Sequence, residues 1–229
     1  MRVRAVVLSL VLAMSGVATL HAQTEEAERV VTAKRVVDEV MRASDSAIPA
    51  AVFENADAIA IFPSTFKAGF IFGGHRGRGV ISVRDDGART WSTPAFLTLT
   101  GGSFGFQIGA QSVDVVMVIM NRAGLEKLLE NEFKIGGDAS AVVGPLGRDL
   151  EASTDILLQA EILSYSRNRG LFAGVSLKGA TIRSDQDANE RFYGRRLDSK
   201  QIVLEGQGGH TRYADVVSDL QATLAKYAP

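Results

Sequence analysis

The chain has 229 residues, no cysteine, and 25 basic against 26 acidic side chains. The lack of cysteine excludes disulfides, thiolate metal sites, cysteine nucleophiles and a lipid-modified N-terminal cysteine. General nucleic-acid binders are strongly basic, so this charge balance predicts no nucleic-acid partner. An anionic partner would have to meet a local cluster of positive charge instead.

Residues 1–22 have the layout of a secretory signal peptide. Two arginines precede an apolar run at 5–12, and the small residue Ala22 stands before the expected cleavage site. An uncleaved membrane anchor is the alternative, although the apolar run is short for a bilayer span of ~20 residues. We therefore expect export to the periplasm, with secretion as the alternative. The remainder, 23–229, has 23 basic and 26 acidic residues and is expected to form a single domain.

The sequence pattern in the first part of this domain predicts helices followed by strands. Residues 25–43 repeat valine and alanine at helical spacing, and Pro49 starts a second, short helix that runs to about Glu54. An apolar strand follows at 57–63, and we expect Pro63 to end it. The next segment, 68–84, predicts two strand-like halves around a glycine-rich centre, and Asp85-Asp86-Gly87 predicts a tight turn.

The rest of the chain alternates apolar strand patterns with three helical ones. Strands are predicted at 95–101, 103–111, 113–120, 155–165 and 171–182, with a brief strand or turn at 201–206. Helices are predicted at 123–133, after the capping residue Asn121, at 185–193 and at 213–228.

This order of elements predicts the fold class. Consecutive strands joined by short turns, with helices at both ends and one in the middle, favour an α+β fold with an antiparallel sheet. Glycines recur inside the strand patterns, where they relieve crowding at bends. We therefore expect a strongly curved antiparallel sheet or a partial barrel with flanking helices.

The stretch FKAGFIFGGHRGRGV (66–80) is rich in both glycine and positive charge. It lacks the GxxxxGK pattern of a nucleotide phosphate loop. Gly74, Gly77 and Gly79 give the reverse of the dinucleotide-binding order GxGxxG. The glycines are therefore interpreted as sheet geometry.

Residues suited to catalysis or metal binding are few. Only His75 and His210 lie outside the signal peptide, so we predict neither an enzyme nor a cofactor. Asp185 and Asp187 are weak calcium candidates, because the Glu and Arg at the sixth and twelfth positions of that segment do not fit a calcium loop. Capping of a helix is the better interpretation of these two aspartates. A hydrolase or a calcium-dependent protein that uses them or Asp114 is a weaker alternative.

The positively charged residues predict an anion-binding site. Arginine beside exposed backbone amides recognises phosphate well, and Phe66, Phe70 and Phe72 could line an apolar surface next to it. The alternative is a solvated hairpin tip with phenylalanines in the core, and Gly101 and Gly102 could form a second site of close backbone approach. The residues predicted to bind lipid or another anion are Lys67, Gly73, Gly74, His75, Arg76, Arg78, Arg148 and Lys178.

Several motifs resemble the SYLF domain family and follow its order over most of the chain. They are DAIAIFPSTFKAGFIFGGHRGRGV (57–80), GGSFGFQIGAQSVDVV (101–116), GPLGR (144–148), YSRNRGLFAGVSLKGATI (165–182) and DANERFYG (187–194). The resemblance implies a lipid-binding domain. Eukaryotic relatives engage phosphoinositide-containing membranes, and fungal relatives also bind and bundle actin.

This sequence departs from those relatives at its N-terminus. It has a signal peptide and a helix that begins with acidic residues, TEEAERVV, where relatives have an amphipathic segment. An exported bacterial-type protein would meet neither actin nor abundant phosphoinositides, so we expect no actin partner. We predict a non-enzymatic protein of the bacterial envelope that binds anionic phospholipid headgroups through a basic, glycine-rich hairpin. The alternative is an envelope structural or protein-interaction module with no lipid ligand.

Overall fold

A computed structural model describes most of the chain that follows the expected signal peptide. The described residues are 25–43, 48–69, 72–85, 87–104, 109–145, 160–168, 171–174, 177–209 and 211–228. Within them no helix is long and apolar enough to cross a membrane.

The described elements confirm the expected α+β class. The first described element is a helix over residues 25–42, which we call the N-terminal helix. The remaining helices are α2 (Ala50–Glu54), α3 (Arg122–Leu128), α5 (Gln186–Tyr193), α6 (Ser199–Val203) and α7 (Ala214–Tyr227). The strands are β1 (Ala58–Gly69), β2 (Phe72–Val83), β3 (Ala95–Phe104), β4 (Gly109–Ile119), β5 (Phe133–Lys134), β6 (Ala141–Val143), β7 (Ile162–Asn168), β8 (Leu171–Gly174) and β9 (Thr181–Ser184).

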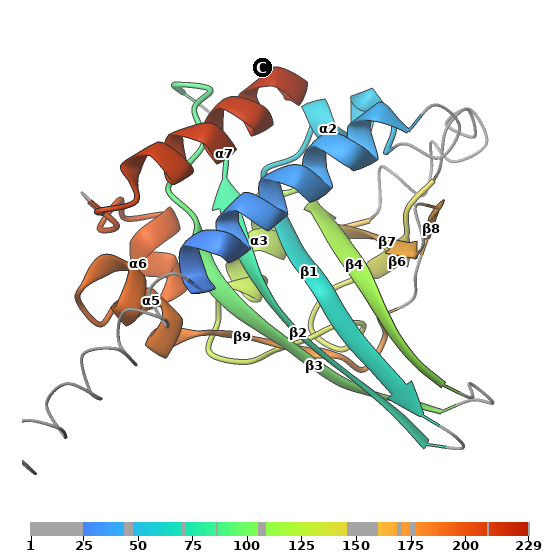
Figure 1. The fold of residues 1–229 in the computed structure, drawn as a ribbon. Helices are drawn as coiled ribbons and strands as arrows, with labels where there is room; N and C mark the ends of the chain where they lie inside the picture. The colour runs from blue at the N-terminus through green and yellow to red at the C-terminus, as the bar shows by residue number, and fades with distance from the viewer. Residues whose placement is uncertain are drawn as a thin grey trace, which may run out of the picture.

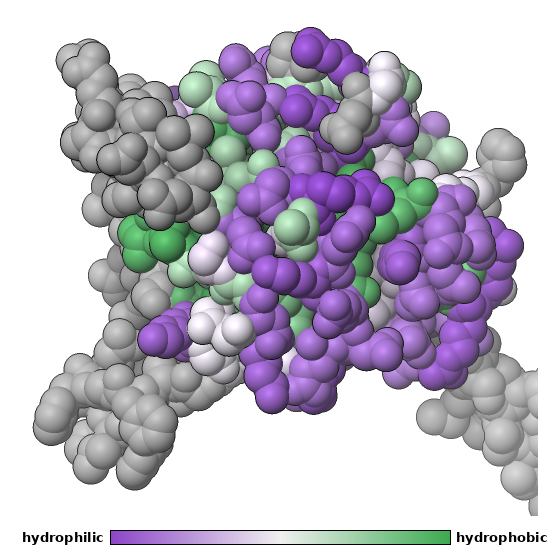
Figure 2. Space-filling model, turned by 180° about the vertical axis from the view of Figure 1, so that it is seen from behind, coloured by the Kyte–Doolittle hydropathy of each residue, from purple (hydrophilic) through white to green (hydrophobic). Residues whose placement is uncertain are grey.

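The strands form one strongly curled sheet, a half-barrel, as the recurring glycines predict (Figure 1). Its order in the described part of the chain is β5-β9-β3-β2-β1-β4-β7-β6, with β8 paired to β7. Every pairing is antiparallel except that of β6 with β7. Seen from behind, the described surface is mainly hydrophilic, with apolar residues showing between polar ones (Figure 2).

The two faces of β2 have different surroundings. Side chains alternate along a strand, so Arg76, Arg78 and Val80 share one face, which we call the outer face. Val80 lies opposite Phe96 of β3, and the Phe96 ring contacts Phe192 of α5, so the helices cover this part of the outer face. The half that leads to the β1–β2 connection leaves both arginines exposed. The helices therefore leave the side chains of Arg76 and Arg78 exposed to solvent.

A bulge in β1 corrects the expectation that Pro63 ends the strand. β1 continues to Gly69, and its register with both neighbours shifts beside the proline. Ser64 has a φ of 51°, and its N–H donates a hydrogen bond of 2.9 Å to Oδ1 of Asp114. A proline has no N–H to donate, and a bulge tolerates that loss. Asp114 also accepts a bond from Arg167, so this carboxylate holds the bulge in place.

Three other boundaries differ from the sequence-based prediction. The three strands expected between 95 and 120 are two longer ones, β3 and β4, whose connection lies outside the described residues. The glycine-rich centre expected within 68–84 lies inside β2, because β1 ends at Gly69 and β2 begins at Phe72, and the two residues between them lie outside the described part. The segment 201–206 begins in α6, whose N-terminus Asp198 and Gln201 close as a capping box.

Other predictions hold with shifted ends. Asn121 caps α3 as expected, but the helix ends at Leu128 and Phe133 belongs to β5. The strand expected at 171–182 is divided into β8 and β9 by a turn. Asp185 caps α5, and the C-terminal helix is α7.

Glycines of β2 allow the bulged β1 to lie close against it. A Cβ at Gly79 would lie 2.3 Å from the carbonyl oxygen of Ile61 and 2.5 Å from Cδ1 of Phe62. A Cβ at Gly77 would lie 2.4 Å from Oγ1 of Thr65. Real Cβ atoms do not approach their neighbours so closely, so these glycines serve the packing of the sheet.

We predict that Gly79→Ala lowers the free energy of unfolding by about 2 kcal/mol, because the added methyl group must displace the β1 backbone. Gly74→Ala is the matched control, since among the described residues its Cβ would meet only the carbonyl oxygen of Gly101, at 3.7 Å. The control should stay within about 0.5 kcal/mol of the parent protein. Urea unfolding measures both values, and equal losses would contradict this account of the glycines.

Candidate anion-binding site

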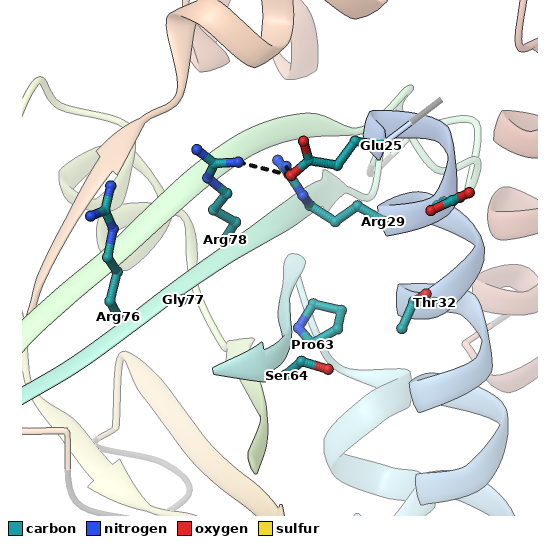
Figure 3. A pocket seen from close by; sticks show the side chains of 9 residues that line it. Glu25, Arg29, Thr32, Pro63, Ser64, Arg76, Gly77 and Arg78 are labelled. Atoms are coloured by element: carbon teal, nitrogen blue, oxygen red, sulfur yellow. Dashed lines mark hydrogen bonds and ion pairs between the residues drawn. The ribbon is translucent and has the colours of Figure 1, made fainter. Parts of the chain in front are cut away.

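A pocket of about 550 Å³ lies beside the exposed arginines of β2. Its walls are the first two turns of the N-terminal helix, the Pro63–Ser64 bulge and residues 76–78. Arg76 and Arg78 rise from β2 on the same side, and Arg29 reaches toward them from the helix (Figure 3). Three guanidinium groups therefore belong to one pocket.

One carboxylate oxygen bridges two of these guanidinium groups. Oε1 of Glu25 accepts a hydrogen bond of 2.9 Å from Nη1 of Arg78 and lies 3.5 Å from Nη2 of Arg29 (Figure 3). Glu25 and Arg78 are exposed, whereas Arg29 is only 8% exposed. Among the described residues, Arg76 has no ion-pair partner.

The burial of Arg29 follows from its position in the helix. The inward stripe of this helix contains Ala33, Val37 and Val40, and helical spacing extends the stripe back to Arg29 and Glu26. The Arg29 guanidinium lies over the ring of Phe96, 5.4 Å from its centroid. A cation above an aromatic face gains a favourable interaction with its quadrupole.

The charge of Arg29 is compensated mainly by carboxylates that do not form hydrogen bonds with its terminal nitrogens. The nearest oxygens of Glu26 and Asp185 are each 3.8 Å away, and neither Nη1 nor Nη2 donates a hydrogen bond. Burial lowers the pKa of Arg29, and the negative charges of Glu26 and Asp185 oppose that shift. Arg29 is therefore a buried cation with unused donors.

Glu26 joins the N-terminal helix to α5. Its side chain is fully buried, and Oε1 accepts bonds of 2.8 Å and 3.2 Å from Nη2 and Nε of Arg191. The hydrogen bond with Glu26 raises the pKa of Arg191. Asp185 caps α5 through Oδ1, and its Oδ2 lies 3.8 Å from Nη1 of Arg29. Two acids from different elements, Glu26 and Asp185, therefore lie beside Arg29.

The structure separates the residues that sequence reasoning grouped together. His75 points to the face opposite Arg76, where its ring fills the space over Gly101: a Cβ there would lie 2.3 Å from Nε2 of His75. Phe66 is the register partner of Arg76 and is 52% exposed, so it lies on the outer face beside the arginine. The pocket thus contains Arg76 and Arg78 of the predicted set, together with Arg29, which the sequence prediction did not include.

The other predicted residues lie elsewhere or outside the described part. Lys67 pairs with His75 and Gly73 with Gly69 along the backbone, and the side chain of Lys67 is outside the described residues. Gly74 is exposed in β2. Lys178 is exposed in the turn before β9, next to Gly136. Arg148, Phe70 and His210 fall outside the described residues.

The weak metal candidates take part in helix capping and ion pairing. Asp185 accepts a bond from the N–H of Ala188 and faces Arg29, and Asp187 is exposed in the first turn of α5. In the described residues no group of three or more His, Asp or Glu side chains could hold a metal ion.

Comparison with known proteins identifies the family. Residues 100–227 match the Ysc84 family model, described as a Las17-binding protein actin regulator. The chain belongs to the Ysc84 (SYLF) family.

Curated members of the Ysc84 family extend this match toward the N-terminus. The chain is 34% identical to Protein YSC84 of Saccharomyces cerevisiae over 189 residues, which cover 81% of this chain and 40% of that protein. It is 37% identical to SH3 domain-containing protein PJ696.02 of Schizosaccharomyces pombe over 172 residues, 73% of this chain and 39% of that one. The human SH3 domain-containing YSC84-like protein 1 is 32% identical over 185 residues, 80% of this chain and 53% of that one. The chain thus spans about half the length of these relatives or less.

We predict that Glu26→Gln lowers the free energy of unfolding by about 3 kcal/mol, because it removes the buried counter-charge that Arg191 and Arg29 share. Glu126→Gln is the matched control, since Glu126 pairs with Arg122 across an exposed helix surface. The control should change stability by at most about 0.5 kcal/mol. Chemical denaturation of both variants provides the comparison, and a small loss in Glu26→Gln would show that the buried ion pairs do not hold the helix.

Proposed function

We propose that the protein is a non-enzymatic binder of anionic membrane surfaces in the bacterial envelope. The observation that carries the proposal is the open half of the outer face, where Arg76 and Arg78 stand exposed on a protein with a net negative charge. A local positive patch on such a protein directs anionic surfaces to one side of the molecule. The expected export of the chain, from residues 1–22, supports the envelope as its location.

The neighbour of Arg76 favours a membrane over a soluble polyanion. Phe66 lies beside Arg76 on the same face, and half of its surface is exposed to solvent. An aromatic side chain of this kind can enter the boundary between headgroups and acyl chains while arginines bind the phosphates.

The non-enzymatic part of the proposal has two supports. The matched family is described as an actin regulator, which is a binding role rather than a catalytic one. The ring of His75 lies over Gly101 on the inner face, away from the pocket that the arginines line.

We predict that the protein floats with phosphatidylcholine vesicles only when they also contain phosphatidylglycerol, and that added salt weakens the binding. Arg76→Ala combined with Arg78→Ala should weaken it about 30-fold, at ~1 kcal/mol for each basic residue near a charged bilayer. Arg42→Ala with Arg122→Ala is the matched control, because it removes the same charge from two exposed helical positions away from the pocket.

Two results would contradict this function. One is flotation that does not depend on anionic lipid, and the other is equal weakening in both double variants. Phe66→Ala adds a separate arm, since it removes the apolar contact and leaves every charge in place. It should weaken vesicle binding without changing the salt dependence.

A protein-binding role is the second candidate, and the family description favours it. The matched family is described as Las17-binding, and one yeast relative is named LAS seventeen-binding protein 3. An exported chain would instead meet an envelope protein, so we expect no cosedimentation with actin filaments. Cosedimentation without vesicle binding would favour the protein-binding role over the membrane one.

A further inference from the structure

The pocket holds two like charges around one surface carboxylate. Arg29 and Arg78 both face Oε1 of Glu25, and Arg78 helps to lower the pKa of Arg29, as a nearby cation must. Glu25 is exposed, whereas Glu26 is buried and Asp185 is half-buried. The one compensating group that can move into solvent is therefore Glu25.

The terminal nitrogens of Arg29 are buried and have no hydrogen-bond partner among the described residues. The side chain is more than nine-tenths buried, lines the pocket, and leaves both terminal nitrogens without hydrogen bonds. Arg78 adjoins it, and Arg76 stands at the same wall without an ion-pair partner in the described residues.

We propose that this pocket binds a phosphate group and that Glu25 is an internal competitor, which the phosphate displaces from Arg29 and Arg78. A phosphate monoester carries more negative charge than one carboxylate and offers three terminal oxygens, so it can accept bonds from both arginines at once. The ligand is free phosphate or the terminal phosphate of a lipid headgroup. For the lipid source, the inference rests on the membrane-binding function proposed above.

The pocket has room for the group to which the phosphate is attached. Its volume of about 550 Å³ exceeds that of a phosphate ion and extends along the helix to Thr32 and along β1 to Ser64 (Figure 3). Hydroxyl groups at these positions can bond to a polar headgroup beyond the phosphate. A lipid headgroup could thus enter from the open outer face while its phosphate meets Arg29.

Glu25→Gln and Glu28→Gln form the matched pair that tests the competitor. Both remove one negative charge from the same helix end and the same pocket, but only Glu25 bridges the arginines. We expect Glu25→Gln to bind inorganic phosphate about 2- to 5-fold more tightly, the gain from releasing an exposed ion pair. Glu28→Gln should change the affinity by less, and equal gains in both variants would overturn the competitor role.

Arg78→Ala should weaken phosphate binding about tenfold or more, because it removes a charge-assisted hydrogen bond. Arg29→Lys removes the buried guanidinium donors and keeps the positive charge. If Arg29→Lys does not fold, Arg78→Ala alone tests the phosphate site. Unchanged affinity in Arg78→Ala would overturn the phosphate site.

Vesicle binding distinguishes free phosphate from a lipid headgroup as the ligand, and it distinguishes the phosphate pocket from the membrane-binding function. Phosphatidylcholine vesicles carry either phosphatidic acid, a monoester, or phosphatidylglycerol, a diester, at equal surface charge. A preference for phosphatidic acid that increases in Glu25→Gln supports the lipid source. Equal binding to both lipids, with no response to Glu25→Gln and no binding of inorganic phosphate, overturns this inference while the membrane function stands. Binding of inorganic phosphate without any vesicle binding supports the pocket and contradicts the membrane function.

Discussion

A guanidinium group removed from water is the constraint on which this arrangement depends. Arg29 is 8% exposed between the N-terminal helix and the outer face of the sheet. A buried charge is strongly unfavourable unless its neighbours supply opposite charge. Glu26 supplies it from the same helix and Asp185 from the N-cap of α5, so Arg29 couples two parts of the chain that are far apart in sequence.

The same constraint explains where an anion would bind. Glu26 and Asp185 lie 3.8 Å from Arg29 and form no hydrogen bond with its terminal nitrogens. Glu25, at the surface, supplies the remaining negative charge that compensates Arg29. That last contribution is exchangeable, because Glu25 is exposed and shared with Arg78. In the proposed phosphate site, a phosphate takes the place of Glu25, and binding at the surface thereby acts on an interaction that also holds the helix to the sheet.

Patterns among neighbouring residues predicted the helices and the curvature of the sheet, whereas features set by contacts between distant residues could not be predicted. Helical periodicity located the helix at 25–42 and α7, and the spacing of glycines predicted the curvature. The bulge at Pro63 could not be predicted, because it depends on Asp114, which lies 50 residues further along the chain. The sequence also identified Arg76 and Arg78 from composition. The alternation of side chains along a strand places His75 on the opposite face from Arg76 and Arg78, and helical spacing places Arg29 on the buried face of its helix. Both patterns are present in the sequence, but they can be applied only when the boundaries of the strand and the helix are known.

The most direct test of the central claim is to map the bound phosphate on the backbone by amide NMR during titration with a short-chain phosphatidic acid. We expect the largest chemical-shift changes in residues 25–29 of the N-terminal helix and in residues 76–78 of β2. Smaller changes should follow at the N-terminus of α5, where Asp185 responds to the altered surroundings of Arg29. Changes centred on α7 or on the reverse side of the sheet, with residues 25–29 and 76–78 unaffected, would contradict it.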